Sequence, residues 1–200
     1  MEITDLDADP RRQLQLWLEA ARAGGQPMPE AMSLATATAE GRPSARMVVL
    51  RQVDSGLVFF TDGDSDKAAD LGANPHAAVV LHWLRPVHRQ VRVAGAVERV
   101  SAAEADRYWA SRPPGARWAA LASHQSRVVA SRPVLEERAA AWARHVPDEG
   151  SLRRPDRWDG FRISPESMEF WEERADRLHD RLRFSLSAGG GGWTVDRLSP

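Results

Sequence analysis

Cysteine is absent from this chain of 200 residues. Its absence excludes disulfides, thiolate nucleophiles and zinc or iron–sulfur sites built on cysteine, and it fits a reducing compartment. Residues 1–10 are acidic and lack an apolar stretch, so we expect no signal peptide, and no apolar run approaches the length of a membrane span. We therefore expect a cytoplasmic protein with no membrane partner.

Lysine and tyrosine each occur once, as Lys67 and Tyr108, while arginine supplies every other basic residue. The 27 basic residues almost balance the 28 acidic ones, giving a net charge of −1, so no overall field favours nucleic acid. The length suits one ordinary domain. We expect a single domain over residues 1–200, with residues 1–9 forming a flexible N-terminus.

Short strand-like runs joined by tight turns dominate the chain, with helical runs between them. The expected helices run from Pro10 to Gly24, Ser65 to Ala73, Ser101 to Ser111 and Pro133 to His145. The expected strands are Ala31–Thr38, Ala45–Val53, Leu57–Thr61, Ala77–Trp83, Arg89–Val100, Gly160–Ile163, Ser167–Trp171, Leu178–Leu186 and Trp193–Leu198. Gly189–Gly192 would join the last two strands as a hairpin. This pattern predicts a mainly β fold with α additions, a closed or split antiparallel barrel.

Local signals place the helix ends and some of the core. Asp9 is an expected N-cap before Pro10, and Ser101 with Glu104 has the spacing of a capping box. Four tryptophans on helical runs are expected core residues, at positions 17, 109, 118 and 142.

We expect no metal site. Asp62-Gly-Asp64-Ser-Asp66 imitates the beginning of a calcium loop, but Lys67 stands where the loop needs glycine and Ala73 where it needs a closing glutamate. The histidines also lack the H-x-x-x-H spacing of a helical zinc site.

Two segments between residues 46 and 67 could each bind an anion. Arg46-Met-Val-Val-Leu-Arg51 places two cations five residues apart, which on one strand sends them to opposite faces. Ser65 is a natural helix cap, and the backbone N–H groups after it, together with Lys67, form a candidate phosphate cradle. Asp66 opposes this interpretation because its charge would repel a phosphate.

A second cationic group follows later in the chain. Tyr108 and Arg112 are four residues apart, share a helix face and could clamp another phosphate. If the segment after Trp171 is a strand, then Arg177, His179 and Arg181 line one face of it. Two separate groups of cationic residues indicate two phosphorylated ligands, or a cofactor and a substrate.

Taken together and in order, these segments resemble the pyridoxamine/pyridoxine 5′-phosphate oxidase family of flavin enzymes over roughly residues 9–200. The residues that carry the resemblance are Arg46-Met-Val-Val-Leu-Arg51, Phe59-Phe-Thr61, Ser65-Asp-Lys67, Arg89-Gln90-Val91, Tyr108-x-x-x-Arg112-Pro113, Gln125-Ser126, Phe170-Trp171, Arg177-Leu-His-Asp-Arg181 and Asp196-Arg-Leu-Ser-Pro200.

The resemblance implies an FMN-binding split β-barrel that forms a homodimer, with two FMN sites at the subunit interface. It implies that FMN is contacted by Arg46, Met47, Val48, Val49, Leu50, Arg51, Phe60, Thr61, Ser65, Lys67, Gln90, Gln125, Ser126, Trp171 and Arg181. Of these, Arg46 and Lys67 would hold the phosphate, with support from Thr61 and Ser126. It implies that a small phosphorylated pyridine is contacted by Arg51, Tyr108, Arg112, Arg177 and His179, with the last two as catalytic residues.

The implied reaction transfers a hydride from the substrate carbon that bears the amine or alcohol to the flavin, and molecular oxygen then reoxidises the flavin with release of peroxide. The sequence departs from the family pattern at several positions, namely Arg51 in place of lysine, Asp66 in place of a basic residue, Phe60 in place of tyrosine, Ala116 in place of serine, and a short N-terminal extension. Two alternatives therefore stay open: a flavin oxidase of the phenazine-biosynthesis type with another substrate, and a flavin-binding protein without turnover.

Overall fold

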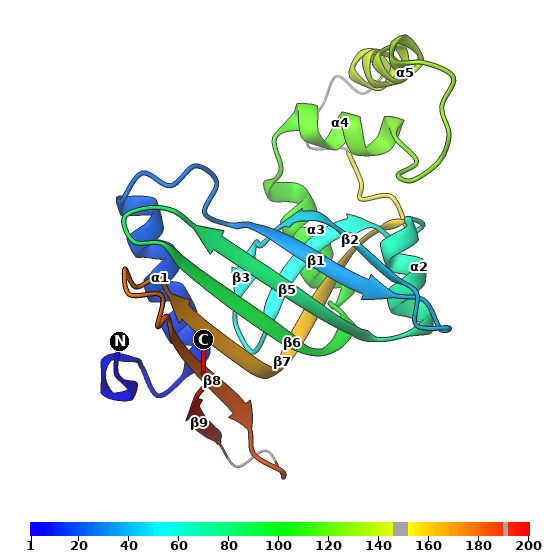
Figure 1. The fold of residues 1–200 in the computed structure, drawn as a ribbon. Coiled ribbons are helices and arrows are strands. Elements are labelled where there is room, and N and C mark those ends of the chain that lie inside the picture. Colours follow the sequence, from blue (N-terminus) through cyan, green and yellow to red (C-terminus); the bar gives the residue numbers. More distant parts are fainter. Residues whose placement is uncertain (146–151, 190–191) are drawn as a thin grey trace.

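One antiparallel sheet forms the body of the molecule, as the computed structural model shows for residues 1–145, 152–189 and 192–200 (Figure 1). Within these residues the strands are β1 (Ala31–Ala37), β2 (Pro43–Val49), β3 (Gln52–Val53), β4 (Leu57–Asp62), β5 (His76–Trp83), β6 (Arg89–Arg99), β7 (Trp158–Glu172), β8 (Asp180–Leu186) and β9 (Trp193–Arg197). The main path through the sheet is β2-β1-β5-β6-β7-β4-β3, and β8 and β9 extend it from β7.

Strand β7 is shared between two parts of the sheet. Its first half pairs with β4, from Leu57 opposite Ile163 to Asp62 opposite Trp158. Its second half pairs with β8, while β6 follows the other edge of β7 along most of its length. The sheet therefore divides where β7 changes partner, and the expected mainly β split-barrel fold is confirmed.

Helices flank the sheet or project from it. They are the 3-10 helix η1 (Ile3–Asp5), α1 (Pro10–Ala23), α2 (Asp66–Ala73), α3 (Ala102–Ser111), α4 (Pro114–Ala122) and α5 (Arg132–His145). The two expected caps form, because Asp9 accepts from the Arg11 N–H and Ser101 accepts from the Glu104 N–H. In Figure 1 α4 and α5 project away from the sheet, while α1 and α2 lie at opposite ends of it.

The core lies inside the barrel and beneath α1. Strand β1 alternates buried and half-buried residues, with Met32 and Leu34 fully buried. Trp17 of α1 packs edge-on against Phe170 of β7, with ring centroids 5.1 Å apart. This apolar interior holds the strands in register and so fixes the residues at the barrel ends.

The observed elements differ from the predicted ones in four main ways. The expected strand Ala45–Val53 is broken between Val49 and Gln52, so it forms β2 and β3. The two strands expected between residues 160 and 171 are one strand, because a β-bulge opposite Gly95 accommodates Pro165 without ending the pairing. Strand β8 begins two residues later than expected, and α4 was not predicted although Pro114 occupies a favourable first helical position.

The other local predictions are mixed. Trp17 and Trp109 are buried, but Trp142 lies on α5 with 39% of its surface exposed. The hairpin between β8 and β9 is confirmed by their antiparallel pairing, although residues 190–191 of its glycine run lie outside the described residues. The segment before α1 contacts the C-terminal strand, since Arg197 donates to the backbone oxygen of Met1. Among the described residues, no helix has the length and apolar character needed to cross a membrane.

Candidate active site

A cavity of about 590 Å³ opens between β2, β4, α2, α3 and the segment after α4. Its walls are made by Ser44, Ala45, Arg46, Met47, Val48, Val49, Arg51, Phe60, Thr61, Asp66, Lys67, Tyr108, Arg112, Gln125, Ser126 and Trp158. Twelve of these are site residues expected from the sequence. Ser44, Ala45 and Trp158 were missed, although the first two precede Arg46 on the same strand and could have been found from that position.

Lys67 lies in the first turn of α2, and its ammonium group is held by neutral oxygens. It donates to Gln125 Oε1 at 2.6 Å, Thr61 Oγ1 at 3.2 Å and Ser65 Oγ at 3.3 Å. Ser65 occupies the N-cap position, but its side chain makes no capping bond and donates to the Asp62 carbonyl oxygen instead. The expected Ser65 side-chain cap is therefore wrong, and the hydroxyl accepts from the lysine.

The charge of Lys67 is incompletely compensated. Burial lowers the pKa of its ammonium group, and the nearby positive charge of Arg46 lowers it further, while Asp62 and Asp66 act in the opposite direction. A buried cation held by neutral groups is stabilised when an anion enters the site. Lys67 is therefore suited to bind a phosphate.

Arg46 is oriented by the neighbouring strand. Its guanidinium donates to Thr36 Oγ1 at 2.7 Å and to Ser44 Oγ at 2.6 Å, and lies 3.8 Å from Asp70. The Thr36 hydroxyl in turn donates to Asp70 at 2.6 Å. Because these contacts fix the side chain before a ligand arrives, Arg46 is a preorganised cation beside Lys67.

Arg46 and Arg51 both line this cavity, so the prediction that they face opposite sides of one strand is wrong. That prediction assumed a continuous strand. The chain leaves β2 after Val49, and the two-residue break before β3 turns Arg51 back to the cavity.

The same cavity also contains arginine side chains that lie beside aromatic rings. Tyr108 stacks on Phe60 with ring centroids 3.9 Å apart, and the Arg51 guanidinium lies 5.7 Å from the Tyr108 ring. Arg112 follows α3 and lies 4.0 Å above the ring of Trp158. Tyr108 and Arg112 both line the cavity, but Arg112 is the extended residue that follows α3, so the expected shared helix face is wrong for Arg112.

Arg112 has unused binding capacity. Its Nη1 atom is buried and makes no hydrogen bond within the described part of the chain. Burial lowers the pKa of this guanidinium, as does the charge of Arg51, whereas Tyr108 raises it. An anionic ligand would supply both the missing acceptor and the missing negative charge.

The remaining expected residues lie elsewhere. Leu50 and Ser65 are buried behind the cavity wall. Gln90, Trp171 and Arg181 stand opposite one another on β6, β7 and β8. The Trp171 ring is 4.9 Å from that of His179, so these residues form a second group.

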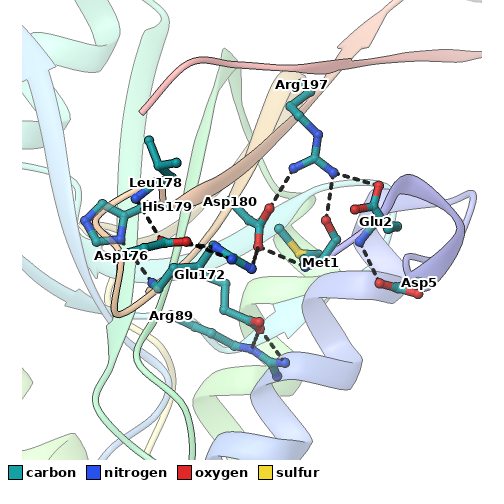
Figure 2. Close-up of polar contacts among 11 residues, drawn as sticks. Met1, Glu2, Asp5, Arg89, Glu172, Asp176, Leu178, His179, Asp180 and Arg197 are labelled. Atoms are coloured by element: carbon teal, nitrogen blue, oxygen red, sulfur yellow. Dashed lines mark hydrogen bonds and ion pairs between the residues drawn. The ribbon is translucent and has the colours of Figure 1, made fainter.

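Arg177 and His179 are not on a strand, which corrects the expected alternation with Arg181. Both lie in the loop between β7 and β8, shown in part in Figure 2, and β8 begins only at Asp180. Arg181 is on β8, where its guanidinium donates to Glu169 at 2.8 Å. The charge of Glu169 raises the pKa of Arg181.

The length of β7 separates the two groups. Trp158 at one end of the strand lines the cavity, whereas Trp171 near the other end does not. Thirteen residues of strand span about 40 Å. Within one subunit, Trp171 therefore does not line the cavity that Lys67 lines. Among the described residues, no cluster of three metal-binding side chains is present.

A split antiparallel barrel with a preorganised cationic cavity at one end defines a barrel protein whose cavity is suited to an anionic ligand. Comparison with known proteins identifies its family. Residues 19–146 match the model of the pyridoxamine 5′-phosphate oxidase family, and residues 158–200 match its pyridoxine 5′-phosphate oxidase C-terminal dimerisation region.

Relatives agree over the full length. The chain is 46% identical to a pyridoxine/pyridoxamine 5′-phosphate oxidase of Burkholderia multivorans, over all of this chain and 93% of that one. It is 47% identical to the enzyme of that name from Cupriavidus metallidurans, over 98% and 92%. The crystal structure of PhzG from Burkholderia lata, in complex with tetrahydrophenazine-1-carboxylic acid, superposes with a TM-score of 0.91 at 33% identity, over 98% of this chain and 95% of that one.

The chain belongs to the pyridoxamine 5′-phosphate oxidase family, and it is an oxidase of this flavin-binding family. The resemblance stated from the sequence is thereby confirmed.

Proposed function

We propose that this chain is an FMN-dependent oxidase that converts pyridoxine 5′-phosphate and pyridoxamine 5′-phosphate to pyridoxal 5′-phosphate. The observation that carries the proposal is the pairing of two cationic groups in one cavity. Arg46 and Lys67 form one group, and Arg51 and Arg112 with Tyr108 form the other. Two phosphorylated ligands, the cofactor and the substrate, account for both groups.

The residues present fit FMN. Lys67 and Arg46 would hold the phosphate, with Thr61 and Ser126 as additional hydrogen-bonding groups, and β2 from Met47 to Val49 would provide a wall for the rest of the molecule. The cavity volume of about 590 Å³ is in the range of cofactor sites. When bound, FMN would accept a hydride from the substrate and pass two electrons to molecular oxygen, giving hydrogen peroxide.

The protein's own contribution is binding and orientation. Arg112 and Arg51 would fix the substrate phosphate, and the Tyr108 hydroxyl would donate a further hydrogen bond. The stacked Phe60 and Tyr108 rings would limit the access of water to this wall. Arg177 and His179 would contact the pyridine ring and set its orientation toward the cofactor.

The site is shared between two copies of the chain in this proposal. Four residues of the second group, Trp171, Arg177, His179 and Arg181, lie within the segment that matches the dimerisation region. Because β7 separates them from Lys67, we infer that each cavity receives them, with Gln90, from the partner subunit. A homodimer then has two sites, and we propose the cytoplasm as its location.

Mixed dimers test the shared site. Co-expression of Lys67→Met with His179→Gln, each impaired alone at limiting FMN, should raise activity above that of either variant, because one of the two sites in a mixed dimer has both residues intact. If each site were built from one chain, every site in the mixed dimer would carry a substitution and activity would not rise.

Peroxide release tests the substrate. The purified protein should be yellow, carry about one FMN per subunit, and release peroxide in a peroxidase-coupled assay with pyridoxine 5′-phosphate and pyridoxamine 5′-phosphate. A colourless protein that does not bind added FMN would contradict the whole proposal.

A second candidate substrate class is a reduced phenazine carboxylic acid. It is favoured by the structural similarity to PhzG, whose crystal structure contains such a compound. A carboxylate would also pair with Arg51 and Arg112. Peroxide release with the reduced phenazine, and none from either phosphorylated vitamer by the flavin-loaded protein, would establish this alternative.

A further inference from the structure

The loop between β7 and β8 is closed by its own hydrogen bonds. The Arg177 N–H donates to the Arg174 carbonyl oxygen at 3.2 Å, which forms a tight turn. The Leu178 N–H donates to Asp176 Oδ1 at 3.1 Å, so the Asp176 side chain spans the residue between them. That residue is Arg177, a proposed substrate contact.

Arg177 has a left-handed backbone, with φ of 66°. A residue with a Cβ atom reaches this region only at a cost in free energy. An aspartate that accepts a hydrogen bond from the N–H two residues later stabilises such a turn. Asp176 therefore offsets the backbone strain at Arg177.

Asp176 also holds Arg174. The Arg174 guanidinium donates to both Asp176 oxygens, at 2.9 and 3.3 Å, and lies 3.9 Å from Asp180 at the beginning of β8 (Figure 2). Asp180 is only 7% exposed and is paired with Arg197 at 2.6 Å. The loop is thus attached to the buried carboxylate of Asp180 at the beginning of β8.

The backbone of Arg174 determines the proton position on His179. Its N–H donates to His179 Nδ1 at 3.1 Å. An amide N–H can only donate, so Nδ1 carries a lone pair and the ring proton of the neutral imidazole is on Nε2. The His179 ring also packs against Trp171, which limits its rotation. Nε2–H is then the group that His179 offers to a ligand.

We propose that Asp176 is a positioning residue that holds Arg177 in the left-handed conformation and, through Arg174, keeps His179 in its Nε2–H form. The proposal rests on the proposed function in that Arg177 and His179 are the residues taken to contact the substrate. In this role His179 donates a hydrogen bond through Nε2 and leaves Nδ1 to the backbone.

The charged surroundings of the ring are few. Glu173 and Arg177 lie on the same loop, and His88 on the neighbouring connection is hydrogen-bonded to Glu173 at 2.7 Å. The interactions of Glu173 with His88, His179 and Arg177 lower the pKa of its carboxyl group, so Glu173 stays charged beside the loop. Its charge does not change the donor and acceptor relationship at Nδ1.

Two substitutions at one position separate positioning from charge. Asp176→Asn keeps the Oδ1 atom that accepts from the Leu178 N–H and from Arg174 Nε, and loses only the Oδ2 contact with Arg174, whereas Asp176→Ala removes all three contacts. We expect Asp176→Ala to lower kcat/KM about ten- to a hundredfold, because small displacements of substrate-contacting groups have effects of this size. Asp176→Asn should stay within about threefold of the parent enzyme, and FMN affinity should be unchanged in both variants.

A spectroscopic readout does not depend on activity. Two-bond ¹H–¹⁵N correlation spectra of the ¹⁵N-histidine-labelled dimer distinguish the two neutral forms of imidazole, and His179→Gln assigns the signal. We expect the Nε2–H form in the parent protein and in Asp176→Asn, and a mixture of forms in Asp176→Ala. Asp106→Ala, which removes an exposed aspartate on α3, is the matched control and should give the parent spectrum.

The outcomes are distinct. An Nδ1–H form in the parent protein, or parent kinetics and a parent spectrum in Asp176→Ala, would overturn the proposal. If the parent enzyme oxidises neither phosphorylated vitamer, the proposed function fails while the spectra still test Asp176. Should Asp176→Ala fold poorly, adding Arg177→Gly should restore folding, because glycine adopts the left-handed conformation without strain. The contacts with Arg174 would still be missing, so the mixture of imidazole forms should persist, and a parent spectrum would overturn the proposal.

Discussion

The Lys67 ammonium donates to Gln125 Oε1 at 2.6 Å, although 58 residues separate the two along the chain. The same oxygen accepts from the Thr61 hydroxyl at 2.7 Å. One amide oxygen thus connects β4, α2 and the segment after α4. The sole lysine of the chain is held in a cavity by neutral groups. Its uncompensated charge costs free energy in the unliganded protein, and an anionic ligand would remove that cost.

Lys67→Met should weaken FMN binding. A hydrogen bond to a charged group contributes about 1.5–3 kcal/mol, so the dissociation constant should rise roughly ten- to a hundredfold. Quenching of flavin fluorescence on titration of the flavin-free protein measures it. Arg132→Ala, on exposed α5, is the control and should bind FMN as the parent does; unchanged affinity in Lys67→Met would place the phosphate elsewhere.

The same substitution should stabilise the flavin-free protein in a pH-dependent way. Burial lowers the pKa of Lys67 below its ordinary value of 10.5. Between the lowered and the ordinary pKa, the unfolded chain binds more protons at this position, so the contribution of Lys67 to stability rises with pH. Urea unfolding should show Lys67→Met more stable than the parent at pH 7. That advantage should shrink as the pH approaches 10.5, and a constant difference would contradict the burial argument.

Asp66→Asn should strengthen FMN binding. Asp66 lines the cavity beside Lys67, and a unit charge about 4 Å from a phosphate costs about 1 kcal/mol in water. Its removal should improve FMN affinity roughly fivefold, with the gain decreasing at high salt. Asp64→Asn changes an exposed neighbour outside the cavity lining and should have little effect; equal gains in both variants would indicate only a change in overall charge.

Arg112→Gln should act on the substrate and leave the cofactor in place. The loss of one charge-assisted contact should raise KM for pyridoxine 5′-phosphate roughly tenfold or more, while FMN affinity should stay unchanged. Steady-state kinetics and flavin titration together separate these effects. Arg138→Gln, on α5 and exposed, is the control. A matching loss of FMN affinity in Arg112→Gln would assign this guanidinium to the cofactor instead.

Much of the barrel could be predicted from the sequence because strand alternation and turn residues are local signals. Asp9 and Ser101 cap helices as their positions predict, and β1 shows the expected alternation. What failed depends on context beyond the next few residues. Pro165 does not end β7, because a bulge accommodates it, and this can be known only from the pairing with β6.

The site shows the same division. The spacing of Tyr108 and Arg112 indicated that they lie close together, and both line the cavity, although Arg112 follows the end of α3. The common orientation of Arg46 and Arg51 could not be predicted from the sequence, because a two-residue break between β2 and β3 reverses the expected alternation. The left-handed backbone at Arg177 was equally hidden, since it depends on side-chain hydrogen bonds within the loop.

The sharing of β7 between two partners has a consequence for biosynthesis. Strand β4, which leads into α2, pairs with the short β3 and with the first half of β7. Leu57 therefore cannot pair until Ile163, more than a hundred residues later, has been synthesised. The wall that carries Thr61 and Lys67 therefore cannot close on a nascent chain that still lacks β7. Flavin must then bind after nearly the entire polypeptide has left the ribosome. A truncated chain that ends after α5 would not bind the cofactor.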